Sequence, residues 1–317
     1  MWKSLAAAAA IAAAVFAPTL AHAAPANEFE QGLHTMWEVL WHQSGVPTRL
    51  VRWEQDLKVR MSGTNVAAHR GHTLRALQEA AAESGLKVID VTDVPGATAN
   101  VSVQITPDAA LPDSQPCETR LEFGTETRID KVTMQMRDSD ARRCAYHEAM
   151  HVMGVRGHPE GRTVLSYFAS RVDGLLPLDR AMLRAWYSPR VSGGMTPFEV
   201  LPVLADELVA ISPDPTAAAQ ARDRFLARTV SEMQAFAEGQ GDVPAIVRRS
   251  GKASEAGVRF GRMEMSYFLG VAYQDGATVQ RDAAQGAQWL QRAATMGSRS
   301  ALARLGAGAA GTASATR

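Results

Sequence analysis

Residues 147–158 have the sequence His-Glu-Ala-Met-His-Val-Met-Gly-Val-Arg-Gly-His, and the rest of the chain can be interpreted around this stretch. His147 and His151 are four residues apart. On a helix both imidazoles project from one face and can reach a single metal ion at about 2.0–2.1 Å. Glu148 follows the first histidine directly, where its carboxylate can hold a metal-bound water and accept its proton. The pentapeptide therefore predicts a helix that carries two metal ligands and a general base.

A third histidine follows within a short distance. Gly154 is a natural position for a left-handed residue that ends a helix, and a sharp bend there would return His158 to the same ion. Three protein ligands and one water form the open tetrahedral arrangement of a catalytic zinc. The other histidines after residue 23 show no comparable spacing and are expected to be surface or structural groups: His34, His42, His69 and His72.

The segments before this helix predict a mixed sheet. Helical periodicity occupies 28–45 and 67–84. Strand patterns occupy four segments, namely 51–61, 86–91, 99–105 and 128–136. The order strand, helix, strand, strand, strand, helix indicates an α/β domain.

With these residues in place, the chain resembles the metzincin metallopeptidases, whose signature is HExxHxxGxxH followed by a tight turn that contains methionine. Residues 163–168 (TVLSYF) resemble that turn, and 178–187 resemble the helix that follows it in matrixin-like members. The resemblance covers about 50–190. It implies a zincin-like α+β or α/β fold, a mixed twisted sheet with an active-site helix, which we assign to residues 28–200.

Two departures from the family pattern affect the site. The third histidine is one residue late, because Gly157 occupies the expected position, and we expect Gly157 to absorb the extra residue as a small bulge. Leu165 stands where the turn methionine would lie, and leucine can preserve the apolar floor beneath the metal. Tyr167 matches a tyrosine that approaches the zinc in several such families; the alternative is an ordinary core or interface aromatic.

The resemblance implies hydrolysis of a peptide bond in a peptide or protein substrate. Zinc would polarise the scissile carbonyl and lower the pKa of its water towards roughly 7. Glu148 would take that proton and pass it to the leaving amine, and Tyr167 would donate to the oxyanion. By analogy, the strand around 120–123 could pair with an extended substrate.

The N-terminus predicts export. Residues 1–23 resemble a signal peptide, with Lys3, an alanine-rich apolar run and the small-x-small pattern Ala21-His22-Ala23; the rival interpretation is a membrane anchor, but the run is short and only weakly apolar. We therefore expect a periplasmic or secreted protein with no transmembrane span after cleavage. In that oxidising compartment Cys117 and Cys144 predict a disulfide, with two buried thiols as the alternative.

The C-terminal part is predicted to be helical. Residues 201–260 form a helical connector, and 307–317 are expected to be a disordered tail. Within 261–306, small residues and the recurrence of Leu269-Gly270 as Leu305-Gly306 resemble the Sel-one-like repeats, relatives of the tetratricopeptide class. Such repeats usually bind proteins or peptides, and a structural cap is the alternative.

Composition narrows the function classes. The chain of 317 residues has 33 basic and 33 acidic side chains and lacks a basic patch or a phosphate-binding glycine motif, so we expect no nucleic-acid partner. The leading hypothesis is an exported zinc metallopeptidase with a helical interaction region. The alternatives are a zinc-binding envelope protein without turnover and a repeat scaffold that binds protein partners; retention of Glu148 argues against the former, because structural zinc needs no base.

Overall fold

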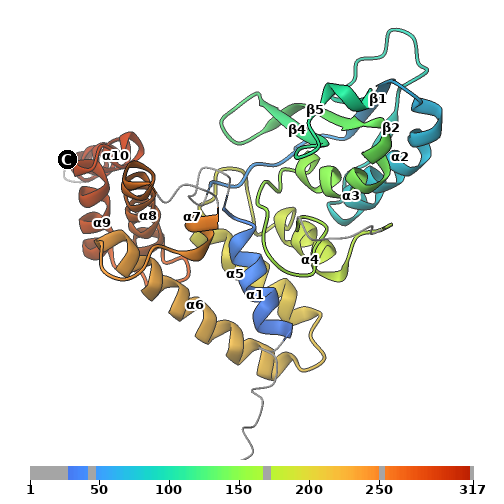
Figure 1. Cartoon of the computed structure of the whole chain (residues 1–317). Coiled ribbons are helices and arrows are strands. Elements are labelled where there is room, and N and C mark those ends of the chain that lie inside the picture. Colours follow the sequence, from blue (N-terminus) through green and yellow to red (C-terminus); the bar gives the residue numbers. More distant parts are fainter. Residues whose placement is uncertain (1–27, 42–47, 167–172, 250–253, 315–317) are drawn as a thin grey trace, which may run out of the picture.

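Figure 1 shows the computed structural model of the chain, which describes residues 28–41, 48–166, 173–249 and 254–314. A sheet covered by helices forms one part of the molecule, and helices alone form the rest. The predicted signal peptide, residues 1–23, lies outside the described residues. Within those ranges, no helix combines the length and the apolar character needed to cross a bilayer.

The sheet has five strands in the order β2-β1-β3-β5-β4. β2, β1, β3 and β5 run parallel, and β4 pairs antiparallel with β5 at the edge. The mixed sheet predicted from the sequence is thereby confirmed. The strands are β1 (Leu57–Gly63), β2 (Val88–Asp90), β3 (Val101–Thr106), β4 (Cys117–Phe123) and β5 (Ile129–Arg137).

One face of this sheet is buried. Along β3, Val101, Val103 and Ile105 are buried and alternate with partly exposed residues, the pattern of strands that are covered on one side. The covering helices are α2 (Val66–Glu83) and α3 (Ala141–Val152), which pack against each other; α2 contacts β1 and β2, whereas α3 contacts β4 and β5. The arrangement is coarsely α+β, and it presents α3 beside the edge strand β4.

Two predicted elements are shorter than their sequence patterns suggest. Helix α1 (Glu28–Glu38) ends seven residues before position 45. The chain leaves the α-helical pattern there, because the N–H groups of Leu40 and Trp41 donate to the carbonyls three residues earlier, those of Trp37 and Glu38. The strand predicted from residue 51 begins only at Leu57. Its first residues serve the core instead, since the Val51 carbonyl accepts a hydrogen bond from the Trp186 indole at 2.8 Å.

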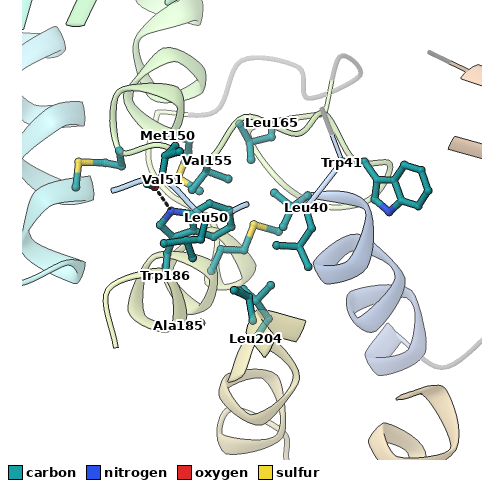
Figure 2. Packing of buried hydrophobic residues seen from close by; sticks show 14 of the residues in the cluster. Leu40, Trp41, Leu50, Val51, Met150, Val155, Leu165, Ala185, Trp186 and Leu204 are labelled. Carbon is teal, nitrogen blue, oxygen red and sulfur yellow. Dashed lines mark hydrogen bonds between the residues drawn. The ribbon is translucent and has the colours of Figure 1, made fainter. Parts of the chain in front are cut away.

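Figure 2 shows this core between the sheet part and the helices. Trp186 lies over Val51, and Leu204 of α5 approaches the same cluster. Each of these three side chains is at most 4% exposed, so the two parts of the molecule share one apolar interior. The helices that follow the sheet are α4 (Pro177–Trp186), α5 (Pro197–Ala210), α6 (Pro215–Glu238), α7 (Ala245–Arg249), α8 (Glu255–Asp275), α9 (Ala283–Thr295) and α10 (Arg299–Ser314).

Helices α8 and α9 approach each other through glycines. A Cβ at Gly270 would lie 2.7 Å from the Leu290 side chain, and one at Gly286 would lie 3.0 Å from the Gly270 carbonyl oxygen. Trp289 of α9 is buried. Helix α10 continues through 307–314, within the tail for which the sequence predicts disorder.

A disulfide joins Cys117 at the start of β4 to Cys144 in α3, as predicted. It is the kind of cross-link found in proteins that fold in an oxidising compartment. Because it connects the sheet edge to the covering helix across 27 residues, it also restricts the unfolded chain.

We predict that a Cys117→Ala/Cys144→Ala double variant loses about 3–4 kcal/mol of unfolding free energy, the loop-entropy value for this separation. Urea denaturation of both proteins would measure the difference. Reductant should destabilise the wild-type protein by a similar amount and leave the double variant unchanged. Equal stability of the two oxidised proteins would contradict the prediction.

Candidate metal centre

Helix α3 carries three of the predicted site residues. His147 and His151 lie one turn apart, and Glu148 is buried between the helix and the sheet edge. The third histidine, His158, lies in the loop that follows the helix.

Helix α3 ends in a Schellman motif around Gly154. The Gly154 N–H donates to the His151 carbonyl at 2.9 Å, and the Val155 N–H donates to the Met150 carbonyl at 3.2 Å. Gly154 has a φ of +91°. A Cβ there would also lie 2.4 Å from the Val51 carbonyl oxygen, so only glycine fits. As predicted, the chain reverses directly after the second histidine.

Two aromatic side chains bind the last carbonyls of α3. The Trp53 indole donates to the Val152 carbonyl at 2.7 Å, and the Tyr187 hydroxyl donates to the Met153 carbonyl at 2.8 Å. Carbonyls at a helix end have no partner within the helix, so these bonds fix the end of α3 in the core.

The loop that carries His158 lies against the end of α1. A Cβ at Gly157 would lie 2.3 Å from the Val39 carbonyl oxygen, so this position requires space rather than a left-handed backbone. The Thr35 hydroxyl donates to the Glu160 carbonyl at 2.8 Å and holds the loop two residues beyond His158. This packing holds the loop of His158 against the end of α1.

The three imidazoles converge on one point. Their Nε2 atoms are separated by 3.2 Å between His147 and His158, and by 3.1 Å between His151 and each of the other two. Ligands at about 2.0–2.1 Å on a tetrahedral ion would be about 3.3 Å apart. The spacing therefore approximates one face of such a tetrahedron.

In two of these rings, a hydrogen bond at Nδ1 determines which ring nitrogen carries the proton. His147 Nδ1 lies 2.8 Å from the Val164 carbonyl oxygen, and His151 Nδ1 lies 2.6 Å from that of Val155. A carbonyl oxygen only accepts, so each Nδ1 carries the proton and each Nε2 presents a lone pair. Two lone pairs 3.1 Å apart repel unless a cation lies between them. These three side chains can thus hold a metal ion.

Burial favours the ligand form of His147. Removal from water, followed in importance by repulsion from His151, lowers the pKa of His147 to about 4. The ring is therefore neutral at physiological pH, as metal coordination requires.

The Val164 carbonyl that orients His147 belongs to a turn anchored on α4. Asp179, which is fully buried, accepts hydrogen bonds from the Thr163 hydroxyl, from the Val164 N–H at 3.2 Å and from the Leu176 N–H at 2.9 Å. Asp179 therefore holds the turn, and the turn holds the ring of His147.

Glu148 is positioned by the edge strand. The Thr119 hydroxyl of β4 donates to Glu148 Oε2 at 2.6 Å. Burial raises the pKa of the Glu148 carboxyl, and the hydrogen bond from Thr119 offsets this effect only in part. A carboxyl with a raised pKa beside a metal site is suited to accept and return a proton.

A cavity of about 600 Å³ opens onto the three histidines and Glu148. The edge strand forms one wall with Thr119 and Leu121, and the disulfide lies at the margin of the cavity. A volume of this size can receive several residues of an extended peptide or a small molecule.

The structure brings together four of the predicted site residues, namely His147, Glu148, His151 and His158, and the predicted disulfide Cys117–Cys144 borders them. Tyr167 lies outside the described residues. Leu165 is fully buried, consistent with an apolar role in its turn. Sequence reasoning did not assign roles to Thr119 or Asp179, since neither belongs to a short motif with the histidines.

Comparisons of the chain with protein-family models, with curated proteins and with solved structures found no match.

Replacing the third ligand should disrupt the metal centre. We predict that His158→Gln lowers zinc affinity by more than the about 10- to 100-fold seen when only the surroundings of a ligand change. His72→Gln, on the neighbouring helix α2, is the matched control and should bind zinc like the wild type. Calorimetric titration of the metal-free proteins would measure both. Unchanged affinity in the His158 variant would remove that residue from the site.

Gly157→Ala tests whether the loop must lie against α1. The added methyl would overlap the Val39 backbone, so we expect a loss of about 1–3 kcal/mol in stability together with weaker metal binding. Gly71→Ala on the exposed face of α2 meets nothing within 4 Å and should instead stabilise by about 0.5–1 kcal/mol. Thermal unfolding and zinc titration would measure both variants. Equal stability and equal zinc affinity of the two variants would contradict the prediction.

Proposed function

We propose that the chain is a zinc-dependent peptidase that hydrolyses peptide bonds. The observation that carries the proposal is the convergence of three imidazole Nε2 atoms beside a buried glutamate at a cavity. The resemblance of residues 147–158 to the metzincin signature supports the same reaction.

Three imidazole ligands suit zinc, copper, iron or nickel, and the resemblance favours zinc. His147, His151 and His158 would hold the ion from one side. When bound, zinc would supply Lewis-acid activation of the scissile carbonyl and of the attacking water.

Glu148 would move the proton. Its carboxylate is next to His147 in sequence and is held by Thr119, so it is oriented before substrate arrives. It would accept a proton from the attacking water and transfer it to the leaving amine. Burial supports this role, because a raised pKa brings the two protonation states closer in energy at neutral pH.

The edge strand β4 supports a peptide substrate. In the described sheet β4 pairs only with β5, and its residues Thr119 and Leu121 line the cavity. An extended peptide could add to this edge through main-chain hydrogen bonds and bring one peptide bond to the metal.

The surrounding features fit an exported enzyme. The disulfide is typical of an oxidising compartment, and we propose that the chain acts in the periplasm or outside the cell. The closely packed α8–α9 pair is proposed as a Sel-one-like unit that binds a protein partner.

We predict that Glu148→Gln keeps wild-type zinc content but cleaves peptides about 100- to 10,000-fold more slowly, the range expected for loss of a general base. The measurements are metal content by atomic emission and cleavage of a fluorogenic peptide library. Glu118→Gln, which alters another carboxylate of the same cavity, is the matched control and should retain most activity.

Equal zinc and equal cleavage in wild type and Glu148→Gln would overturn the peptidase mechanism. Equal zinc without cleavage by either protein would favour the alternative, a zinc-stabilised binding protein of the cell envelope.

A further inference from the structure

Arg156 lines the metal cavity between two of the histidine ligands in sequence. It is half-buried and lies in the loop between His151 and His158. The backbone on either side is fixed: the Val155 carbonyl accepts from His151 at 2.6 Å, and Gly157 lies against Val39. The guanidinium is thus attached to a segment that the metal site itself keeps in place.

The other charged side chains of the cavity have partners in the structure. Glu148 accepts from Thr119. The remaining ion pairs are Arg143 with Asp140, Glu118 with Arg120, and Asp113 with Arg137. Within the part of the chain that the structure describes, Arg156 is the cavity cation without an ion pair or a hydrogen-bond acceptor.

An arginine in this situation favours an anionic ligand. A guanidinium carries five N–H donors, and partial removal from water without acceptors is costly. A carboxylate matches the planar fork with two parallel hydrogen bonds and one compensating charge.

We propose that Arg156 binds a carboxylate group of the peptide substrate inside the metal cavity. The inference rests on the proposed function, and it names the substrate class as peptides with a carboxylate near the scissile bond. Carboxylates are the anionic groups of an unmodified peptide, and they have two sources: an acidic side chain or the free C-terminus.

The binding test does not depend on turnover. Succinic and glutaric monohydroxamates would bind the zinc-loaded protein through the hydroxamate, and each has an amide-terminated analogue in which the carboxylate is neutral. We expect the wild type to bind at least one acid about 10- to 100-fold more tightly than its amide, the effect of a charge-assisted hydrogen bond. Calorimetry would give the dissociation constants.

Arg156→Gln should abolish this preference and leave binding of the amides and the zinc content unchanged. Arg156→Lys should retain part of it, because the charge remains while the planar fork is lost. The control Arg143→Gln alters the paired arginine of the cavity and should keep the full preference. A preference that survives in Arg156→Gln, or that is absent in the wild type with every acid, would overturn the proposal, as would failure of all the hydroxamates to bind.

Peptide cleavage distinguishes the two sources. One set of peptide pairs would differ in a free or amidated C-terminus, and a second set would differ in Glu or Gln at each position around the cleaved bond. The kcat/KM values of wild type and Arg156→Gln on these pairs would show which carboxylate Arg156 recognises. An Arg156-dependent preference among hydroxamates with no cleavage of any peptide would leave the carboxylate site standing and reject the peptidase. Cleavage of peptides without any preference for acids would support the peptidase and reject the carboxylate site.

Discussion

The mutual repulsion of imidazole lone pairs is the constraint on which the candidate metal centre depends. His147 and His151 both direct Nδ1–H at backbone carbonyls, which leaves their Nε2 lone pairs facing each other at 3.1 Å. Such an arrangement is unfavourable in a protein that holds nothing there, and it becomes favourable when a cation lies between the rings. The surrounding structure must therefore resist the separation of the rings, and it does so from three directions. Gly154 ends α3 and turns the chain, Asp179 fixes the turn that contacts His147, and the end of α1 supports the loop of His158.

The edge strand of the sheet forms another wall of the cavity that contains the three histidines. Strand β4 is antiparallel at the edge and connected to α3 by the disulfide, so Thr119 is held at hydrogen-bonding distance from Glu148. Residues of the same strand line the cavity. Strand β4 therefore orients Glu148, the proposed base, and carries the edge at which we propose that a peptide substrate pairs. The disulfide holds this strand against α3.

Short-range patterns in the sequence predicted the residues at the centre of the site and the mixed sheet around it. The spacing of His147 and His151 on a helix, the glycine that ends it and the pairing of the two cysteines depend on neighbours in sequence or on composition, so local rules were sufficient. Thr119 and Asp179 were not predicted, because their contacts form only when distant segments meet in the fold. Arg156 was not predicted either, because its place in the cavity lining can be recognised only once the cavity has formed. The predicted start of β1 was wrong for a related reason. Residues 51–53 alternate like a strand, but the Val51 carbonyl accepts from the Trp186 indole and the Trp53 indole donates to the end of α3.

The position of His158 also involves the helical part of the molecule. Helix α1 packs against α5 and α6, and Glu38 near its end accepts a hydrogen bond from the Glu160 N–H at 2.9 Å. Arg249 of α7 pairs with both Glu38 and Glu160. Ion pairs at or near the surface contribute about 0–1 kcal/mol each, so most of the connection must come from the apolar packing of α1 and the close contact at Gly157. Because α1 lies between the helices and the loop, a shift of α5 or α6 that moved α1 would move His158 away from the other two rings. The geometry of the three-histidine cluster therefore depends on helices far from it in the sequence and not on the segment 147–158 alone.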